Sequence, residues 1–106
     1  MLHAANWHDV VRRRLEGEKP EVSDSQDWPA TNFADEAAWS NAVAKLFETG
    51  QALTATVRQF SASKLQEHRP GTDGTWYDLI IGELQHVLYH AGQVTLLKKA
   101  RARVAV

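Results

Sequence analysis

The chain has 106 residues, of which 43% are hydrophobic and 24% charged, so it fits one globular domain spanning residues 1–106 and leaves no room for a second. Its net charge of -1 provides no excess of Lys and Arg for wrapping nucleic acid or coating an anionic membrane. Cysteine is absent, which excludes disulfides, thiolate nucleophiles and Cys-ligated zinc, so any bound metal must use nitrogen and oxygen ligands.

The sequence shows neither a secretory signal nor a membrane span. The first residues lack a basic stretch followed by an apolar run, and no apolar segment approaches the roughly 20 residues that a spanning helix needs. We therefore expect a soluble, cytoplasmic protein with no membrane partner.

Two clusters of turn-forming residues, 17–32 and 70–74, divide the chain into three segments with helical periodicity. Neither cluster can continue a helix. No run of Val, Ile and aromatic residues alternates with polar ones over a strand length, so β structure has little support. Two long segments of nearly equal length joined by a short turn favour antiparallel packing. The predicted fold class is all-α, an up-and-down helical bundle with three main helices.

The first predicted helix covers residues 2–16, and Gly17 is its natural stop. Side chains that recur at steps of three and four share one face of it. These are His3, Trp7, Val10 or Val11, and Arg14. The short basic run 12–14 is diluted by neighbouring acidic residues, so we interpret it as a solvated face and expect no nucleic-acid partner.

The second helix is predicted from Asp35 to about Ser63, capped by Asp35 or Asn32. The third is predicted over residues 76–103, with Thr75 and Asp78 in capping-box spacing at its start. The apolar residues expected to face inward follow in chain order. They are Trp39, Ala42, Val43, Leu46, Leu53, Val57 and Phe60 in the second helix, and Trp76, Leu79, Ile80, Val87, Val94 and Leu97 in the third.

Polar groups interrupt the apolar stripe of the third helix. His86 and His90 have i, i+4 spacing, which places two imidazoles one turn apart and lets both bind a single ion. Burying an imidazole without a partner costs about 1 to 3 kcal/mol, so two on one stripe require partners. One bound metal would provide a partner for both imidazoles. Hydrogen bonds to backbone, water or each other are the alternative.

A third ligand can come from the first helix, where His3 shares a face with Trp7. His8 lies about 140° around the helix from His3, so both cannot face one site squarely. Three protein nitrogens with open positions describe a catalytic metal site rather than a closed structural one, and a water held there could be activated. Three roles are open to Glu83: a carboxylate that reaches the end of the bundle, a histidine partner, or a catalytic base. We expect His68, at a helix end, to be exposed to solvent.

The stretch from Gln85 to Ala100 resembles the last-helix signature of the DinB/YfiT-like superfamily, in which two histidines one turn apart precede Gly-Gln and an aliphatic residue. The opening segment 3–17 looks like that family's second helix, which brings the first metal histidine and ends in Arg-Leu-Gly; here it ends in Arg-Leu-Glu-Gly. Asp27-Trp28-Pro29 and Trp39 also resemble its inter-helix region.

The resemblance implies a DinB-like helical bundle of four-helix type, with a divalent metal, zinc or nickel, held by His3, His86 and His90. Candidates for a catalytic role beside that metal are Glu83, Tyr89 and Gln93. Related proteins include transferases that use low-molecular-weight thiols, a thiol-dependent isomerase and metal-dependent hydrolases. The resemblance therefore implies a metal-dependent thiol transferase or hydrolase that acts on a small molecule, with a low-molecular-weight thiol as a second cofactor candidate.

The chain also departs from that family. Members normally have a whole helix before the one that carries the first histidine, and that helix is missing here. Three helices cannot enclose a four-helix core, so we expect a truncated reading frame or a second subunit, most simply a homodimer, that covers the exposed surface. A non-catalytic dimerisation or interaction module with hydrogen-bonded histidines is the alternative function.

Overall fold

A computed structural model describes residues 1–30 and 35–104, and these are helical with connecting loops. In chain order the elements are α1 (Leu2–Leu15), α2 (Asp24–Asp27), α3 (Glu36–Gln59), the 3-10 helix η1 (Ala62–Lys64) and α4 (Trp76–Val104). The described residues contain no strand and show one isolated bridge, between His68 and Thr75. The predicted all-α class is confirmed. None of these helices is long and apolar enough to cross a membrane.

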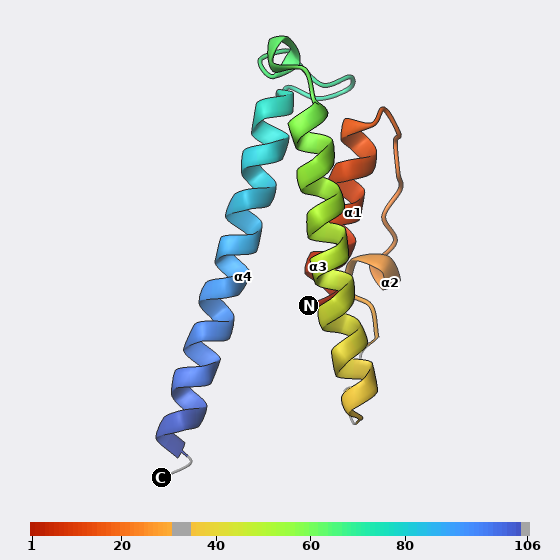
Figure 1. The fold of residues 1–106 in the computed structure, drawn as a ribbon. Helices are drawn as coiled ribbons and strands as arrows, with labels where there is room; N and C mark the ends of the chain where they lie inside the picture. The colour runs from red at the N-terminus through yellow and green to blue at the C-terminus, as the bar shows by residue number, and fades with distance from the viewer. Residues whose placement is uncertain (31–34, 105–106) are drawn as a thin grey trace.

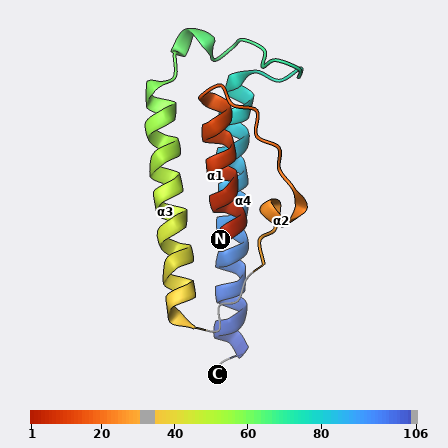
Figure 2. The same ribbon diagram turned by 90° about the vertical axis from the view of Figure 1, so that its right-hand side faces the viewer.

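The long helices α3 and α4 run in opposite directions and are joined by a loop at one end of an elongated molecule of 53 × 24 × 24 Å (Figure 1). The shorter helix α1 packs along α3 and against the first part of α4, so it links the two. A view from the side shows α1 lying in front of α4 and beside α3 (Figure 2). The antiparallel directions of α3 and α4 are as the segment lengths predicted, but the two helices are held together mainly through α1 rather than packed directly on each other.

Local signals at the helix ends act as expected. α1 ends in a Schellman motif, in which Gly17 adopts φ +94° and the Glu18 amide donates to the Arg13 carbonyl over 2.9 Å. The Asp35 carboxylate caps α3 by accepting from the Ala38 amide, while the alternative cap Asn32 lies outside the described residues. Thr75 and Asp78 form the predicted capping box at α4, with each side chain bonded to the other's amide.

The core is centred on α1 and is smaller than the periodicity predicted. The buried apolar residues are Ala4, Ala5, Val10, Val11 and Leu15 of α1, with Ala42 of α3. Trp39, Val94 and Leu97, which were expected to face inward, are exposed. α1 begins at Leu2, level with the middle of α4, so α4 continues beyond it without cover from that helix (Figure 1).

Two boundaries also differ from the prediction. α3 ends at Gln59 rather than near Ser63, and η1 follows it. The stretch 17–32 was predicted to hold no helix, yet it contains the single-turn helix α2, whose capping box joins Ser23 and Gln26. α2 places Asp27 and Trp28 beside α1, where they form part of the site.

Candidate metal centre

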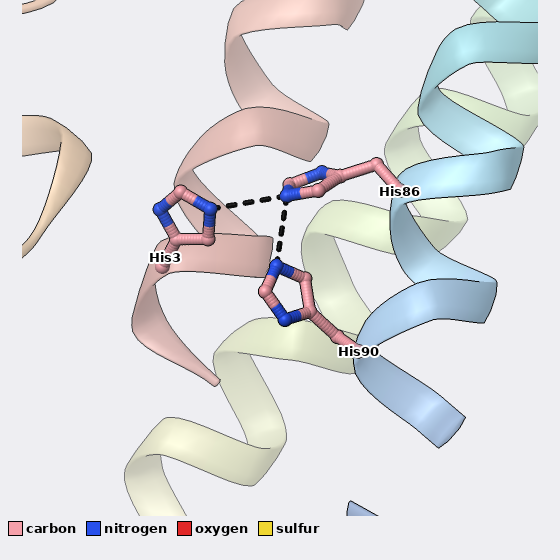
Figure 3. Close-up of side chains that lie close together, drawn as sticks. All are labelled: His3, His86 and His90. Atoms are coloured by element: carbon pink, nitrogen blue, oxygen red, sulfur yellow. Dashed lines mark hydrogen bonds between the residues drawn. The ribbon is translucent and has the colours of Figure 1, made fainter. Parts of the chain in front are cut away.

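Three histidines from two helices converge. His3 comes from the first turn of α1, whereas His86 and His90 occupy successive turns of α4. Their rings point toward one another (Figure 3), with 3.0 Å between the Nε2 atoms of His3 and His86 and 2.9 Å between those of His86 and His90. One nitrogen from each ring lies within 4.8 Å of the others, and all three residues are partly buried. The structure thus brings together the three residues that the sequence singled out.

The opposite nitrogen of each ring faces an oxygen. His3 Nδ1 donates to the Asp27 carbonyl over 2.6 Å, and His90 Nδ1 donates to Gln93 Oε1 over 2.7 Å. His86 Nδ1 lies 3.4 Å from Glu83 Oε2. Carboxylate and carbonyl partners of this kind fix the tautomer and orientation of metal-binding histidines.

Two of these contacts place ring hydrogens. A neutral imidazole carries a single ring hydrogen, so His3 and His90, which donate through Nδ1, present lone pairs at Nε2. His86 Nε2 faces both lone pairs and can donate its own ring hydrogen to them. With that hydrogen on Nδ1 toward Glu83, His86 instead presents a third lone pair, and one cation at the centre can accept all three.

The spacing suits such a cation. Zinc binds imidazole nitrogen at about 2.0–2.1 Å in tetrahedral geometry, which puts ligand nitrogens about 3.3 Å apart. The observed distances of 2.9 and 3.0 Å between Nε2 atoms require only small side-chain movements to reach that value. Burial and the nearby rings of His90 and His3 lower the pKa of His86, which favours the neutral form that a metal needs. The donor set therefore fits a divalent metal.

A family model of the DinB superfamily matches residues 1–94, which include all three histidines. The chain belongs to the DinB superfamily. The expected family membership and bundle class are confirmed by this match together with the helical fold. No curated protein and no solved structure matches the chain.

Glu83 lies beside His86 of the triad and is buried, with 7% of its surface exposed. One carboxyl oxygen faces His86, and the other, Oε1, lies 3.7 Å from His8 Nε2 and has no hydrogen-bond partner among the described residues. Burial raises the pKa of Glu83 to about 7. Among the roles predicted for Glu83, the geometry directly shows that of a histidine partner.

His8 does not join the triad, in agreement with its angular distance from His3. Its Nδ1 lies 3.3 Å from the Thr49 hydroxyl, which itself donates to carbonyls of α3. Burial lowers the pKa of His8, which favours its neutral form. The contacts therefore run from Thr49 through His8 and Glu83 to His86.

The other two candidate catalytic residues, Tyr89 and Gln93, are exposed on α4. Gln93 is exposed and contacts His90, as given above, while Tyr89 is 65% exposed with its ring centroid 5.6 Å from that of His90. Catalytic roles for Glu83, Tyr89 and Gln93 stay predictions. His68, expected to be solvated, is exposed and bonded to the Asp73 carbonyl.

Asp27 and Trp28 also belong to the site, although no role there was predicted for them. The Trp7 indole donates to Asp27 Oδ1 over 2.6 Å, so Asp27 ties α2 to α1 as well as contacting His3. The Trp28 ring stacks on His3, with centroids 4.0 Å apart and planes 7° from parallel. The capping-box spacing of Ser23 and Gln26 was the available signal that this loop is ordered.

A pocket of about 480 Å³ opens beside the triad. Its wall includes two of the three histidines together with apolar, acidic and basic side chains. The lining residues are His3, Trp7, Val11, Asp27, Arg69, Asp78, Leu79, Gly82, Glu83 and His86. Its volume lies within the range of small-molecule sites.

Proposed function

We propose that this DinB-superfamily chain binds one divalent metal, zinc or nickel, through His3, His86 and His90, and acts as a metal-dependent transferase or hydrolase on a small molecule. The single observation that carries the proposal is the convergence of the three Nε2 atoms, each on a ring whose opposite nitrogen faces an oxygen. Three protein ligands leave at least one position of a tetrahedral metal for substrate or water.

The metal would supply Lewis acidity, lowering the pKa of a bound thiol or water. The chain's own residues would orient this centre: Asp27 and Gln93 fix the rings of His3 and His90, and the stacked Trp28 covers one face of His3. A low-molecular-weight thiol as co-substrate belongs to the same proposal, because the adjacent pocket has room for a small molecule next to the open position.

The test is metal content per chain, measured by elemental analysis of protein purified without a histidine tag. We expect close to one zinc or nickel per chain in the wild type and its loss in His90→Ala, with helix content retained in the circular dichroism spectrum. His68→Ala, which removes an exposed histidine outside the triad, is the matched control and should keep the metal. Equal metal content in wild type and His90→Ala would refute the ligand assignment.

A second role, self-association, is favoured by an apolar groove between α3 and α4, and we propose a second copy of the chain as its occupant. The groove has a volume of about 1010 Å³ and its residues include Leu46, Phe47, Leu53, Val57, Ile80, Leu84 and Val87. Phe47 and Leu84 are 66% and 54% exposed, and exposed apolar surface of this kind is costly for a monomer. A two-fold contact would place the same apolar stripe on both partners.

Sedimentation at micromolar concentration should show a dimer for the wild type, and Leu84→Glu should shift it to monomer because a carboxylate would be buried without a partner. Gln85→Glu adds the same charge at the neighbouring exposed position and should leave the dimer intact. A wild-type monomer, or a dimer unaffected by Leu84→Glu, would contradict this interface.

A further inference from the structure

Arg69 lies at the junction of two pockets. It lines the 480 Å³ pocket beside the histidines and also a second pocket of about 540 Å³ on the side where α1 ends. The second pocket is lined by three cationic side chains, Arg14, Lys19 and Arg69, and by one carboxylate, Glu18. Glu18 is already paired with Arg13 at 3.2 Å. The lining of the second pocket is therefore positively charged.

The backbone holds Arg69 in a defined position. Its amide donates to the Gly74 carbonyl over 2.8 Å, and its own carbonyl accepts from the Thr72 amide over 3.2 Å. The neighbouring pair, His68 and Thr75, forms the isolated bridge. The side chain thus projects from an ordered turn, so little conformational entropy of the backbone would be lost when it binds a ligand.

The guanidinium groups of Arg14 and Arg69 form no ion pair within residues 1–30 and 35–104. Arg69 Nε is also buried without a hydrogen-bond partner among these residues. Arg14 lies over the Trp7 ring at 5.6 Å. Arg14 and Arg69 line the same pocket, and burial first, then the positive charge of Arg69, lowers the pKa of Arg14.

One carboxylate, Asp78, lies near Arg69. Its hydrogen bonds with Thr75 in the helix cap, and after them the charge of Arg69, lower the pKa of Asp78, but the two side chains form no ion pair. Asp27 contacts Trp7 and His3. Two guanidinium groups that line one pocket and form no ion pair with the described residues match the planar, bidentate recognition of carboxylate or phosphate.

We propose that Arg69 and Arg14 form a subsite for an oxyanion, the carboxylate or phosphate end of a substrate whose other end lies at the histidine triad. The proposal rests on the proposed function for the position of the reacting end, since Arg69 and the triad line one pocket. The anionic end lies across the junction in the second pocket, where Lys19 adds positive charge. The substrate class is therefore a small anionic molecule rather than a neutral one.

The subsite is tested in metal-free protein, so that it is judged separately from the metal centre. Inorganic phosphate and acetate are titrated separately while the Nε–Hε signals of arginine side chains are followed by NMR. We expect the Arg69 signal to shift with at least one anion, because a buried donor gains a charged acceptor. A response to phosphate alone would identify a phosphate subsite, and a stronger response to acetate a carboxylate subsite.

Substitutions complete the test. Arg69→Gln should weaken binding of the responding anion by about tenfold or more, and Arg14→Gln should weaken it as a second, independent variant. Arg101→Gln removes the same charge from the exposed end of α4 and should leave binding unchanged. Absence of an Arg69 shift with either anion, or equal weakening by all three substitutions, would overturn the subsite. Metal retained at the wild-type level in a triad variant, with these anion responses intact, would contradict only the metal proposal.

Discussion

Replacing His86 by Ala is expected to weaken zinc binding by at least about a hundredfold. Structural zinc sites contribute about 10–16 kcal/mol over four ligands, so one ligand accounts for about 3 kcal/mol, which corresponds to two powers of ten in affinity. His86 is the central member, since its Nε2 lies within 3.0 Å of both other rings. Competition with a chromophoric chelator at pH 7.5 measures the affinity.

The same titration compares His86→Ala with His68→Ala, which should match the wild type. His90→Ala should also bind weakly, yet His86→Ala should be the weaker of the two because it also removes the ring that contacts Glu83. An affinity for His86→Ala within threefold of the wild type would show that the lone pairs do not converge on a metal.

Glu83→Gln is expected to stabilise the metal-free protein at pH 8 and to leave its stability nearly unchanged at pH 5. Burial raises the pKa of Glu83 from an ordinary 4.5 to about 7. Between these values the folded protein holds a proton that the unfolded chain releases, so the free energy of unfolding falls as pH rises through this window. Ionised Glu83 destabilises the folded protein in full above pH 7, and the loss in free energy of unfolding is about 3 kcal/mol at most.

Glutamine cannot ionise, so the variant avoids this cost. The lowered pKa values of His8 and His86 act in the opposite direction, reducing stability as the pH falls, and they largely cancel when variant and wild type are compared at one pH. Urea denaturation at pH 5 and pH 8 gives the two differences. Glu48→Gln, at an exposed position of α3, should show no comparable pH-dependent gain. A Glu83→Gln variant that is less stable than wild type at pH 8 would contradict the prediction.

Much of the candidate site follows from local sequence pattern. The i, i+4 spacing of His86 and His90 is a property of one helix, so sequence alone placed their rings together. His3 was predicted as the third ligand from its shared face with Trp7 and from the family resemblance. The structure places it in contact with His86. Asp27 was missed because its position depends on how an irregular loop returns to α1, and no periodicity encodes that path.

The errors in the core have a different origin. The periodicity of Val94 and Leu97 identifies an apolar face of α4 but does not reveal where the neighbouring helix begins. Because α1 starts level with the triad, this face has no cover from α1 beyond His90. The role of Glu83 likewise depends on tertiary structure, since its contact with His8 joins two helices that are distant in sequence.

The contact between His3 and His86 spans 83 residues of sequence. A metal bound there would act as a cross-link between the first turn of α1 and the middle of α4, closing most of the chain into a loop. A ligand that binds only the folded chain stabilises it in proportion to the logarithm of its free concentration. The melting temperature of this small bundle would then report the metal supply of its surroundings, and chelation would loosen α1 at the same time as it removed the Lewis acid.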